Sequence, residues 1–140
     1  MKPSLFISLI IFNTFKCFGQ TPDAESIVEG IQSSAYFGNA VSNAGDVNGD
    51  GYDDVIVGAY MYDNGQTNEG VAYIFHGSEF GINTSPALIL ECNQASANFG
   101  ASVPTAGDIN NDGFRYLYVC SRGYKNTNSS NRNLLFINNK

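Results

Sequence analysis

Short apolar runs separated by polar, glycine-rich turns follow one another from residue 38 onward, a pattern typical of an all-β protein. Val55–Ala59 and Val71–Phe75 contain β-branched or aromatic side chains and are bounded by Asn, Asp and Gly. Gly38–Ala44 precedes them and Ala87–Glu91 follows. No segment beyond residue 19 shows sustained helical periodicity. The pattern predicts four strands, with turns at 76–78 and 81–83.

The sequence repeats itself with an offset of 62 residues. Residues 26–59 align with 88–121 without a gap, and 15 of the 34 aligned positions are identical. The identical pairs include Phe37/Phe99, Gly38/Gly100, Gly45/Gly107, Asp46/Asp108, Asn48/Asn110, Asp50/Asp112 and Gly51/Gly113. Such a period, with four antiparallel strands per unit, predicts β-propeller blades. We expect repeat 1 at about 32–92 and a partial repeat 2 at about 94–140. An outer strand at Ser26–Ile31 and a late strand at Leu134–Ile137 complete the expectation.

An acidic loop between the first two expected strands has the donors of a calcium site. Side-chain oxygens stand at its positions 1, 3, 5 and 9, and a glycine at position 6. Ca²⁺ takes six to eight oxygen ligands of this kind. We predict side-chain ligands at Asp46, Asn48, Asp50 and Asp54, and a carbonyl ligand from Tyr52 by analogy with similar loops. An EF-hand or a dockerin has an acid at position 12 of its loop, where this chain has Val57, so neither applies. A metal-free, Asx-rich turn is the alternative to a calcium site.

A second copy of the loop begins at Asp108. It keeps Asp108, Asn110 and Asp112, with the carbonyl of Phe114 as the counterpart of Tyr52. Its ninth position holds Tyr116 in place of an aspartate, so we expect weaker calcium binding there.

The first 19 residues read as a secretory signal peptide. Lys2 precedes an apolar stretch, and Cys17 and Gly19 suit the positions before a cleavage site. Without Lys2 and Lys16, five basic residues face 13 acids, a formal charge of −8. Such an acidic chain is an improbable partner for nucleic acid. After residue 19, no stretch is apolar and long enough to be a transmembrane segment.

Two cysteines, Cys92 and Cys120, remain beyond this leader. An oxidising compartment permits a disulfide between them, and two unpaired, half-buried thiols are the alternative.

The motifs together resemble the FG-GAP repeat of the integrin alpha-chain β-propeller. The resemblance rests on Phe37-Gly38, the acidic loop and Val57-Gly58-Ala59, and it covers about residues 26–121. It implies four-stranded blades with the cation loop between strands one and two. Phe37 and Phe99 would be core wedges, and Gly38 and Gly58 would allow close backbone approach.

The resemblance also implies a ring that usually has seven blades, of which this chain holds about one and a half. Further blades or a second chain would be needed to close it. The second repeat departs from the pattern, because Cys120-Ser121 stands in place of Gly-Ala.

Catalysis is not expected. His76 is the only histidine, and no cluster of zinc ligands or nucleophile with a base can be built around it. The candidate partner surface is formed by the loops opposite the cation side, Tyr60–Glu69 and Asn93–Asn98, which offer contacts to an extracellular protein or a glycan. The leading hypothesis is a secreted or cell-surface, calcium-stabilised adhesion propeller. The alternatives are the non-catalytic propeller of a larger secreted hydrolase or lyase, and a truncated remnant.

Overall fold

The computed structural model describes residues 26–113, 115–122 and 134–136, and every regular element in this part of the chain is a strand. The expected signal peptide and Phe114 lie outside the described residues. The described residues contain no helix long and apolar enough to cross a membrane. The all-β prediction is confirmed.

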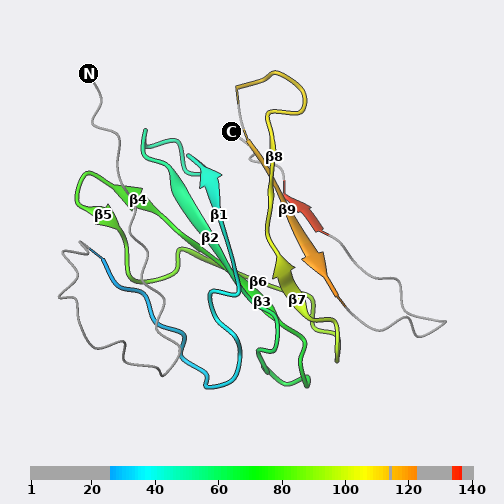
Figure 1. The fold of residues 1–140 in the computed structure, drawn as a ribbon. Helices are drawn as coiled ribbons and strands as arrows, with labels where there is room; N and C mark the ends of the chain where they lie inside the picture. Colours follow the sequence, from blue (N-terminus) through cyan, green and yellow to red (C-terminus); the bar gives the residue numbers. More distant parts are fainter. Residues whose placement is uncertain (1–25, 114, 123–133, 137–140) are drawn as a thin grey trace.

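The first blade is a four-stranded antiparallel sheet with the order β1-β2-β3-β6 (Figure 1). Its strands are β1 (Ala40–Gly45), β2 (Asp54–Ala59), β3 (Val71–Phe75) and β6 (Leu88–Glu91). Each strand overlaps the one predicted from the hydrophobic pattern. The chain thus folds one complete four-stranded blade, with a short hairpin inserted between β3 and β6.

The second blade is partial and repeats the register of the first. It contains β7 (Phe99–Ser102), β8 (Thr105–Gly107), β9 (Tyr116–Ser121) and β10 (Leu134–Phe136), with β9 paired to the other three. Ser102 pairs with Cys120 as Ala40 pairs with Gly58, 62 residues earlier. The counterpart of β1 is split into β7 and β8 around Pro104, which has no N–H for the ladder.

Two expectations at the edges of the first blade are wrong. Residues 26–30 form no strand, because no described strand lies beside them to supply ladder hydrogen bonds. Instead Val28, 4% exposed, turns into the core. The segments expected as turns form a short hairpin of β4 (Gly77–Ser78) and β5 (Gly81–Ile82).

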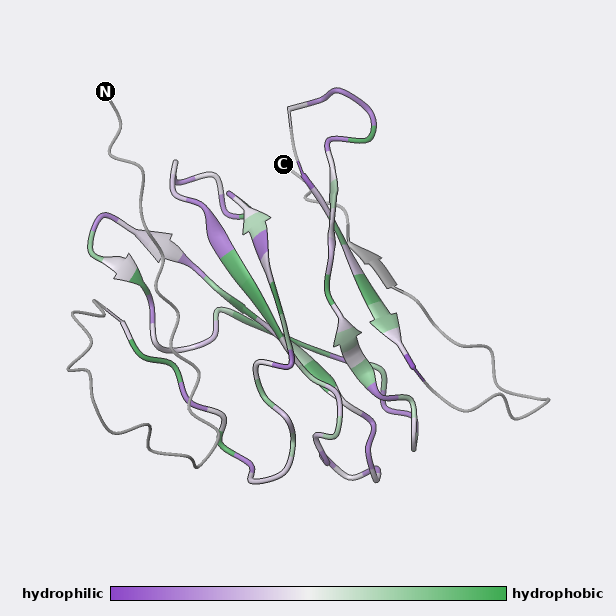
Figure 2. Ribbon diagram, in the orientation of Figure 1, coloured by the Kyte–Doolittle hydropathy of each residue, from purple (hydrophilic) through white to green (hydrophobic). Residues whose placement is uncertain are grey.

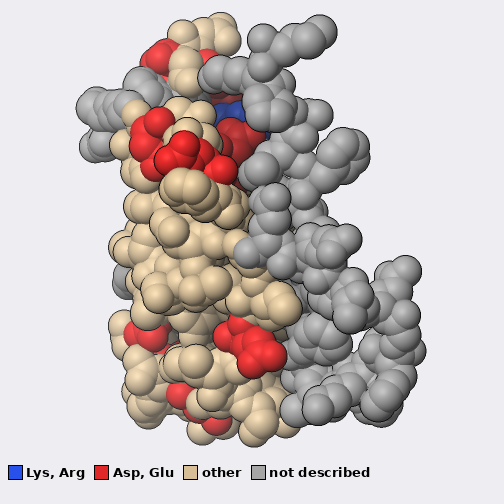
Figure 3. All heavy atoms as spheres, turned by 90° about the vertical axis from the view of Figure 1, so that its left-hand side faces the viewer, with Lys and Arg blue, Asp and Glu red and all other residues tan. Residues whose placement is uncertain are grey.

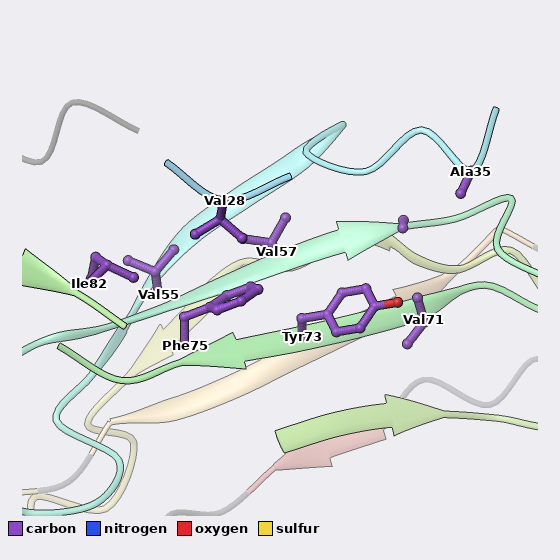
Figure 4. Packing of buried hydrophobic residues seen from close by; sticks show 9 residues of the cluster. Val28, Ala35, Val55, Val57, Val71, Tyr73, Phe75 and Ile82 are labelled. Atoms are coloured by element: carbon purple, nitrogen blue, oxygen red, sulfur yellow. The ribbon is translucent and has the colours of Figure 1, made fainter. Parts of the chain in front are cut away.

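The two central strands of the first sheet, β2 and β3, are buried on both faces. Val55, Val57, Tyr73 and Phe75 point to one face (Figure 4). Val28 and Ala35 from the N-terminal segment cover that face. Figure 2 shows the apolar residues in the middle of the strands and the polar residues in the loops at both ends.

The other face packs against the second blade. Ile56, Ala72 and Ile74 meet Phe99 and Val119, and the Phe99 side chain is fully buried. Full burial of a side chain of this size stabilises the fold by roughly 2–3 kcal/mol. Phe99 is therefore a core wedge between blades, as expected, whereas Phe37 is only half-buried against the first face.

Candidate metal loops

The first acidic loop is organised by the carboxylate of Asp46. Its Oδ1 accepts hydrogen bonds from the amides of Gly49 (2.6 Å) and Asp50 (3.0 Å), and its Oδ2 accepts one from Gly51 (2.8 Å). Gly49 and Gly51 have φ of 76° and 95°, a left-handed backbone that glycine adopts without steric cost. The turn around Asp46 therefore depends on the two glycines.

Asn48 and Asp50 lie next to each other on the same loop. The Asp50 amide, which also bonds Asp46, donates to Asn48 Oδ1 at 3.0 Å, and Asn48 Nδ2 donates to Asp50 Oδ2 at 2.8 Å. The remaining Asp50 oxygen accepts from the amide of Tyr52 at 2.9 Å. Three of the predicted ligands are thus drawn together by shared backbone donors.

The ninth-position carboxylate, Asp54, is the first residue of β2 and is fully buried. Its two oxygens accept the amides of Val47 and Gly77, each at 2.8 Å. Burial raises the pKa of Asp54, and so does the charge of Asp50, while the two amide bonds and His76 lower it. Asp54 therefore ties the loop to the start of the sheet.

The second loop repeats four of these hydrogen bonds. The Asp112 amide donates to Asp108 Oδ1 (3.1 Å) and Asn110 Oδ1 (3.3 Å), and Asn110 Nδ2 donates to Asp112 Oδ2 (2.8 Å). Gly113, with φ of 90°, donates to Asp108 Oδ2 at 2.9 Å. The repeat seen in the sequence is thus also a repeat of local geometry.

The ninth position of the second loop differs in chemistry and in contacts. Tyr116 begins β9 and is 8% exposed. Burial raises the pKa of its phenol, as do the charges of Asp112 and Asp108 and its hydrogen bond to Asp112, while a bond from Asn110 lowers it. The ninth position of the second loop thus holds a neutral phenol near the carboxylates that we predicted as cation ligands.

The two loops also differ in charge. Residues 46–54 contain four aspartates and no basic residue, whereas residues 108–116 contain two aspartates and Arg115. Both loops lie at the same end of the molecule (Figure 1). Figure 3 shows acidic side chains at both ends of the visible face, with an uncharged band between them. The first loop is the more strongly anionic of the two.

The donor set of the first loop decides whether its residues fit a cation. Within the described ranges, no group of three or more His, Cys, Asp or Glu side chains is arranged to hold a metal ion. The donors are instead aspartate, asparagine and backbone oxygens, which are the ligands that Ca²⁺ accepts. The chemistry of the first loop fits Ca²⁺, and its predicted ligands remain a prediction.

Sequence reasoning missed the residues that support the loops. Gly77 supplies the amide that bonds Asp54 across 23 residues, and Asn43 bonds both the Gly45 amide and the Asp53 carboxylate. No local motif marks Gly77, because it becomes a neighbour of Asp54 only through the pairing of β2 with β3.

The opposite end of the blade holds a compact polar loop. The Glu69 side chain is fully buried, and its Oε1 accepts from the Asn64 amide at 2.5 Å. Asn64 Nδ2 donates to both carboxylate oxygens of Glu91, at 2.9 and 3.0 Å. Of the tyrosines proposed for partner binding, Tyr62 packs on the core beside Tyr73, and Tyr60 lies 5.2 Å from Tyr36 between ring centroids. Tyr62 thus has a packing role.

Cys92 and Cys120 are half-buried and are not joined by a disulfide, and the Cys92 thiol donates to the carbonyl oxygen of Glu69 at 3.7 Å. The structure thus does not contain the disulfide that an oxidising compartment would permit.

Comparison with known proteins agrees with this geometry. The model of the FG-GAP repeat family matches residues 37–75, which run from Phe37 through the first acidic loop to the end of β3. Integrin alpha-3 of Cricetulus griseus is 39% identical over 99 residues, which are 68% of this chain and 9% of that protein.

Two further relatives show the same partial coverage. Integrin alpha-6 of Gallus gallus is 43% identical over 90 residues, or 64% of this chain and 8% of that protein. Phosphatidylinositol-glycan-specific phospholipase D of Rattus norvegicus is 35% identical over 101 residues, or 71% of this chain and 12% of that protein. The chain spans only about a tenth of the length of these relatives. Residues 37–75 thus match the FG-GAP repeat, and the chain is similar to integrin alpha chains over about two thirds of its own length.

Proposed function

We propose that this chain is part of a calcium-stabilised, extracellular FG-GAP propeller that serves adhesion or ligand binding. The observation that carries the proposal is the first acidic loop, whose four aspartates run from the residue after β1 to the first residue of β2 on a backbone shaped by Gly49 and Gly51. The similarity to integrin alpha chains supports an adhesion role for the parent protein.

The role proposed for Ca²⁺ is structural. Asp46, Asn48, Asp50 and Asp54, with the Tyr52 carbonyl, would hold the ion and join the first two strands. The described residues contain only two Lys or Arg side chains, Arg115 and Arg122, and neither lies within residues 46–54. The ion would stabilise the folded blade by mass action and supply no chemistry of its own.

Calorimetric titration of the full chain with Ca²⁺ tests the proposal. We expect binding at submillimolar to millimolar Ca²⁺, the range of extracellular calcium modules. At about 100 times the Kd, the free energy of unfolding should rise by about 2.7 kcal/mol. Asp50→Ala should abolish the heat of binding. Asp53→Ala, which removes an exposed carboxylate outside the predicted ligand set, is the matched control. Equal binding by both variants would refute the site.

Secretion is part of the same proposal. Expression of the full chain in a secreting host should release a product that begins at Gln20, as read by N-terminal sequencing. Retention of residues 1–19 on the secreted product would contradict the signal peptide.

A second candidate function has its own observation. The similarity to a phospholipase D over 101 residues favours a non-catalytic propeller attached to a secreted hydrolase. Sequencing the source transcript on both sides of this segment separates the two candidates. Additional FG-GAP blades beside a membrane anchor would favour adhesion, and a hydrolase domain would favour the second candidate.

A further inference from the structure

Four peptide bonds of this chain join an asparagine or an aspartate to a glycine, the pairs that form a cyclic imide most readily. They are Asn48-Gly49, Asp50-Gly51, Asn64-Gly65 and Asp112-Gly113. In the reaction, the glycine nitrogen attacks the carbonyl carbon of the preceding side chain, and glycine has no Cβ to hinder that approach. The nitrogen must give up its hydrogen, so a hydrogen bond that holds this hydrogen slows the attack. The contacts of the glycine amide therefore decide which bond reacts.

Three of the four glycine amides are held by an aspartate. The amides of Gly49 and Gly51 donate to the two oxygens of Asp46, at 2.6 and 2.8 Å. The amide of Gly113 donates to Asp108 Oδ2 at 2.9 Å. A carboxylate at that distance also opposes the negative charge that the nitrogen acquires when it loses its hydrogen. The two acidic loops thus protect their own Asn-Gly and Asp-Gly bonds.

Gly65 differs from the other three glycines. It lies in the exposed loop between β2 and β3, and its amide donates to no group among the described residues. A Cβ atom placed on Gly65 would meet no other atom within 4 Å, so the space around it is open. The Gly65 nitrogen can therefore reach the Asn64 side chain, with room for the ring that forms.

The Asn64 side chain joins this loop to the outer strand of the blade. Its Nδ2 donates to both carboxylate oxygens of Glu91, the last residue of β6, at 2.9 and 3.0 Å. The same loop also bonds the second blade, because the carbonyl oxygen of Asn68 accepts the amide of Asn98 at 3.0 Å. Conversion of the Asn64 amide to an acid would remove the donors that hold the loop on β6.

We propose that Asn64-Gly65 is a site of spontaneous deamidation, and that its conversion loosens the loop from β6 and from the second blade. The Gly65 nitrogen forms a bond to Asn64 Cγ, the Cγ–Nδ2 bond breaks, and ammonia leaves with the hydrogen from Gly65. Water then opens the imide to aspartate or isoaspartate. Both products carry a carboxylate in place of the amide that donated to Glu91, and like charges repel. The inference does not depend on calcium.

The first experiment incubates the full chain in mildly alkaline buffer with chelator and follows both asparagines by peptide mass spectrometry. Asn64 should deamidate at least about tenfold faster than Asn48, because a hydrogen bond to a charged group, such as that of Gly49, is worth about that factor or more. The matched control is the chain unfolded in urea, where the two sites should react at similar rates. Equal rates in the folded chain, or a faster reaction at Asn48, would overturn the inference.

The second experiment tests the consequence with Asn64→Asp, which copies one product. The amide of Asn98 should exchange its hydrogen about two- to tenfold faster, the range for one lost hydrogen bond. Adding Glu91→Gln supplies a donor to the new carboxylate and should restore the wild-type rate. Adding Glu79→Gln, at an exposed position outside this contact, should not. An unchanged rate in Asn64→Asp, or no recovery with Glu91→Gln, would overturn the proposed loosening.

Discussion

Gly58 of β2 and Gly100 of β7 lie in backbone contact across the two blades. A Cβ atom built on Gly58 would stand 2.0 Å from the carbonyl oxygen of Gly100 and 2.9 Å from its carbonyl carbon. Neither backbone can move away without shifting a sheet. Gly58-Ala59 of the first blade thus packs against Phe99-Gly100 of the second. The contact requires glycine at position 58.

We therefore expect Gly58→Ala to loosen the contact between blades. Overpacking of this kind costs about 1–3 kcal/mol of unfolding free energy. The amide of Phe99 donates to the backbone carbonyl oxygen of Glu69 at 2.9 Å across the same interface. This amide should lose hydrogen-exchange protection. Gly65→Ala is the control, because a Cβ there meets no atom within 4 Å. It should lower stability through its positive φ without affecting Phe99.

The contact at Gly58 explains the structural effect of Cys120, which replaces this glycine in the second repeat. Cys120 stands in the register position of Gly58, since Ser102↔Cys120 repeats Ala40↔Gly58. A side chain at 120 prevents another Phe-Gly segment from approaching β9 as closely as Gly100 approaches β2. The sequence shows the replacement, but only the 2.0 Å contact shows its steric consequence.

Asp54 should stabilise the chain even when calcium is absent. Asp54→Ala leaves the amides of Val47 and Gly77 without their acceptor, and each unpaired buried amide costs about 1–3 kcal/mol. Asp54→Asn keeps one acceptor and should lose about half as much. Urea unfolding in chelator measures both losses. Asp53→Ala, at an exposed position, should change stability little, and a loss equal to that of Asp54→Ala would refute this account.

The strands were predictable because their apolar runs are continuous and end at Gly, Asn or Asp. The hydrophobic pattern of Val71–Phe75 leaves no other assignment, and the repeat fixes the second blade from the first. Residues 26–31 were assigned wrongly, because a strand needs a neighbouring strand and the pattern cannot show whether one is there.

The site was predictable only in part, and the reason is physical. Spacing along one loop identifies Asp46, Asn48 and Asp50, because their contacts are local. The partners of Asp54, the amides of Val47 and Gly77, come from the folded loop and from strand pairing across 23 residues, and spacing along the sequence does not show them.

Replacing the carboxylate oxygen Oε2 of Glu69 should not lower the free energy of unfolding. Among the buried side-chain atoms of the described residues, its Oε2 has no hydrogen-bond partner, whereas Oε1 accepts from Asn64. Glu69→Gln keeps an acceptor for Asn64 and should leave stability equal or higher. Glu69→Ala removes that acceptor and should cost about 2 kcal/mol. Thermal unfolding separates the two, with the exposed Glu79→Gln as control. A larger loss for Gln than for Ala would contradict this prediction.

The buried phenol of Tyr73 should make the chain sensitive to alkali. Burial raises the pKa of Tyr73 far above its usual value near 10, and the charge of Tyr62, a hydrogen bond donated to Tyr62 and the charge of Glu91 raise it further. Above about pH 10 the unfolded chain loses this proton while the folded chain keeps it. Stability should therefore fall as pH rises above that point, and this residue should have no effect below it.

Tyr73→Phe removes the phenolic proton that the folded chain keeps and the unfolded chain loses. The variant should lose stability less steeply with rising pH, by up to about one proton in the slope, as measured by urea unfolding between pH 9 and 12. The same substitution at the exposed Tyr52 controls for the loss of a phenol as such. The direction follows from the core, because ionising Tyr73 would place a charge beside Phe37 and Phe75, which lie 5.7 and 6.2 Å from its ring centre. A steeper decline in Tyr73→Phe than in the wild type would mean that the folded chain releases this proton more readily than the unfolded chain, which is incompatible with a phenol buried in that core.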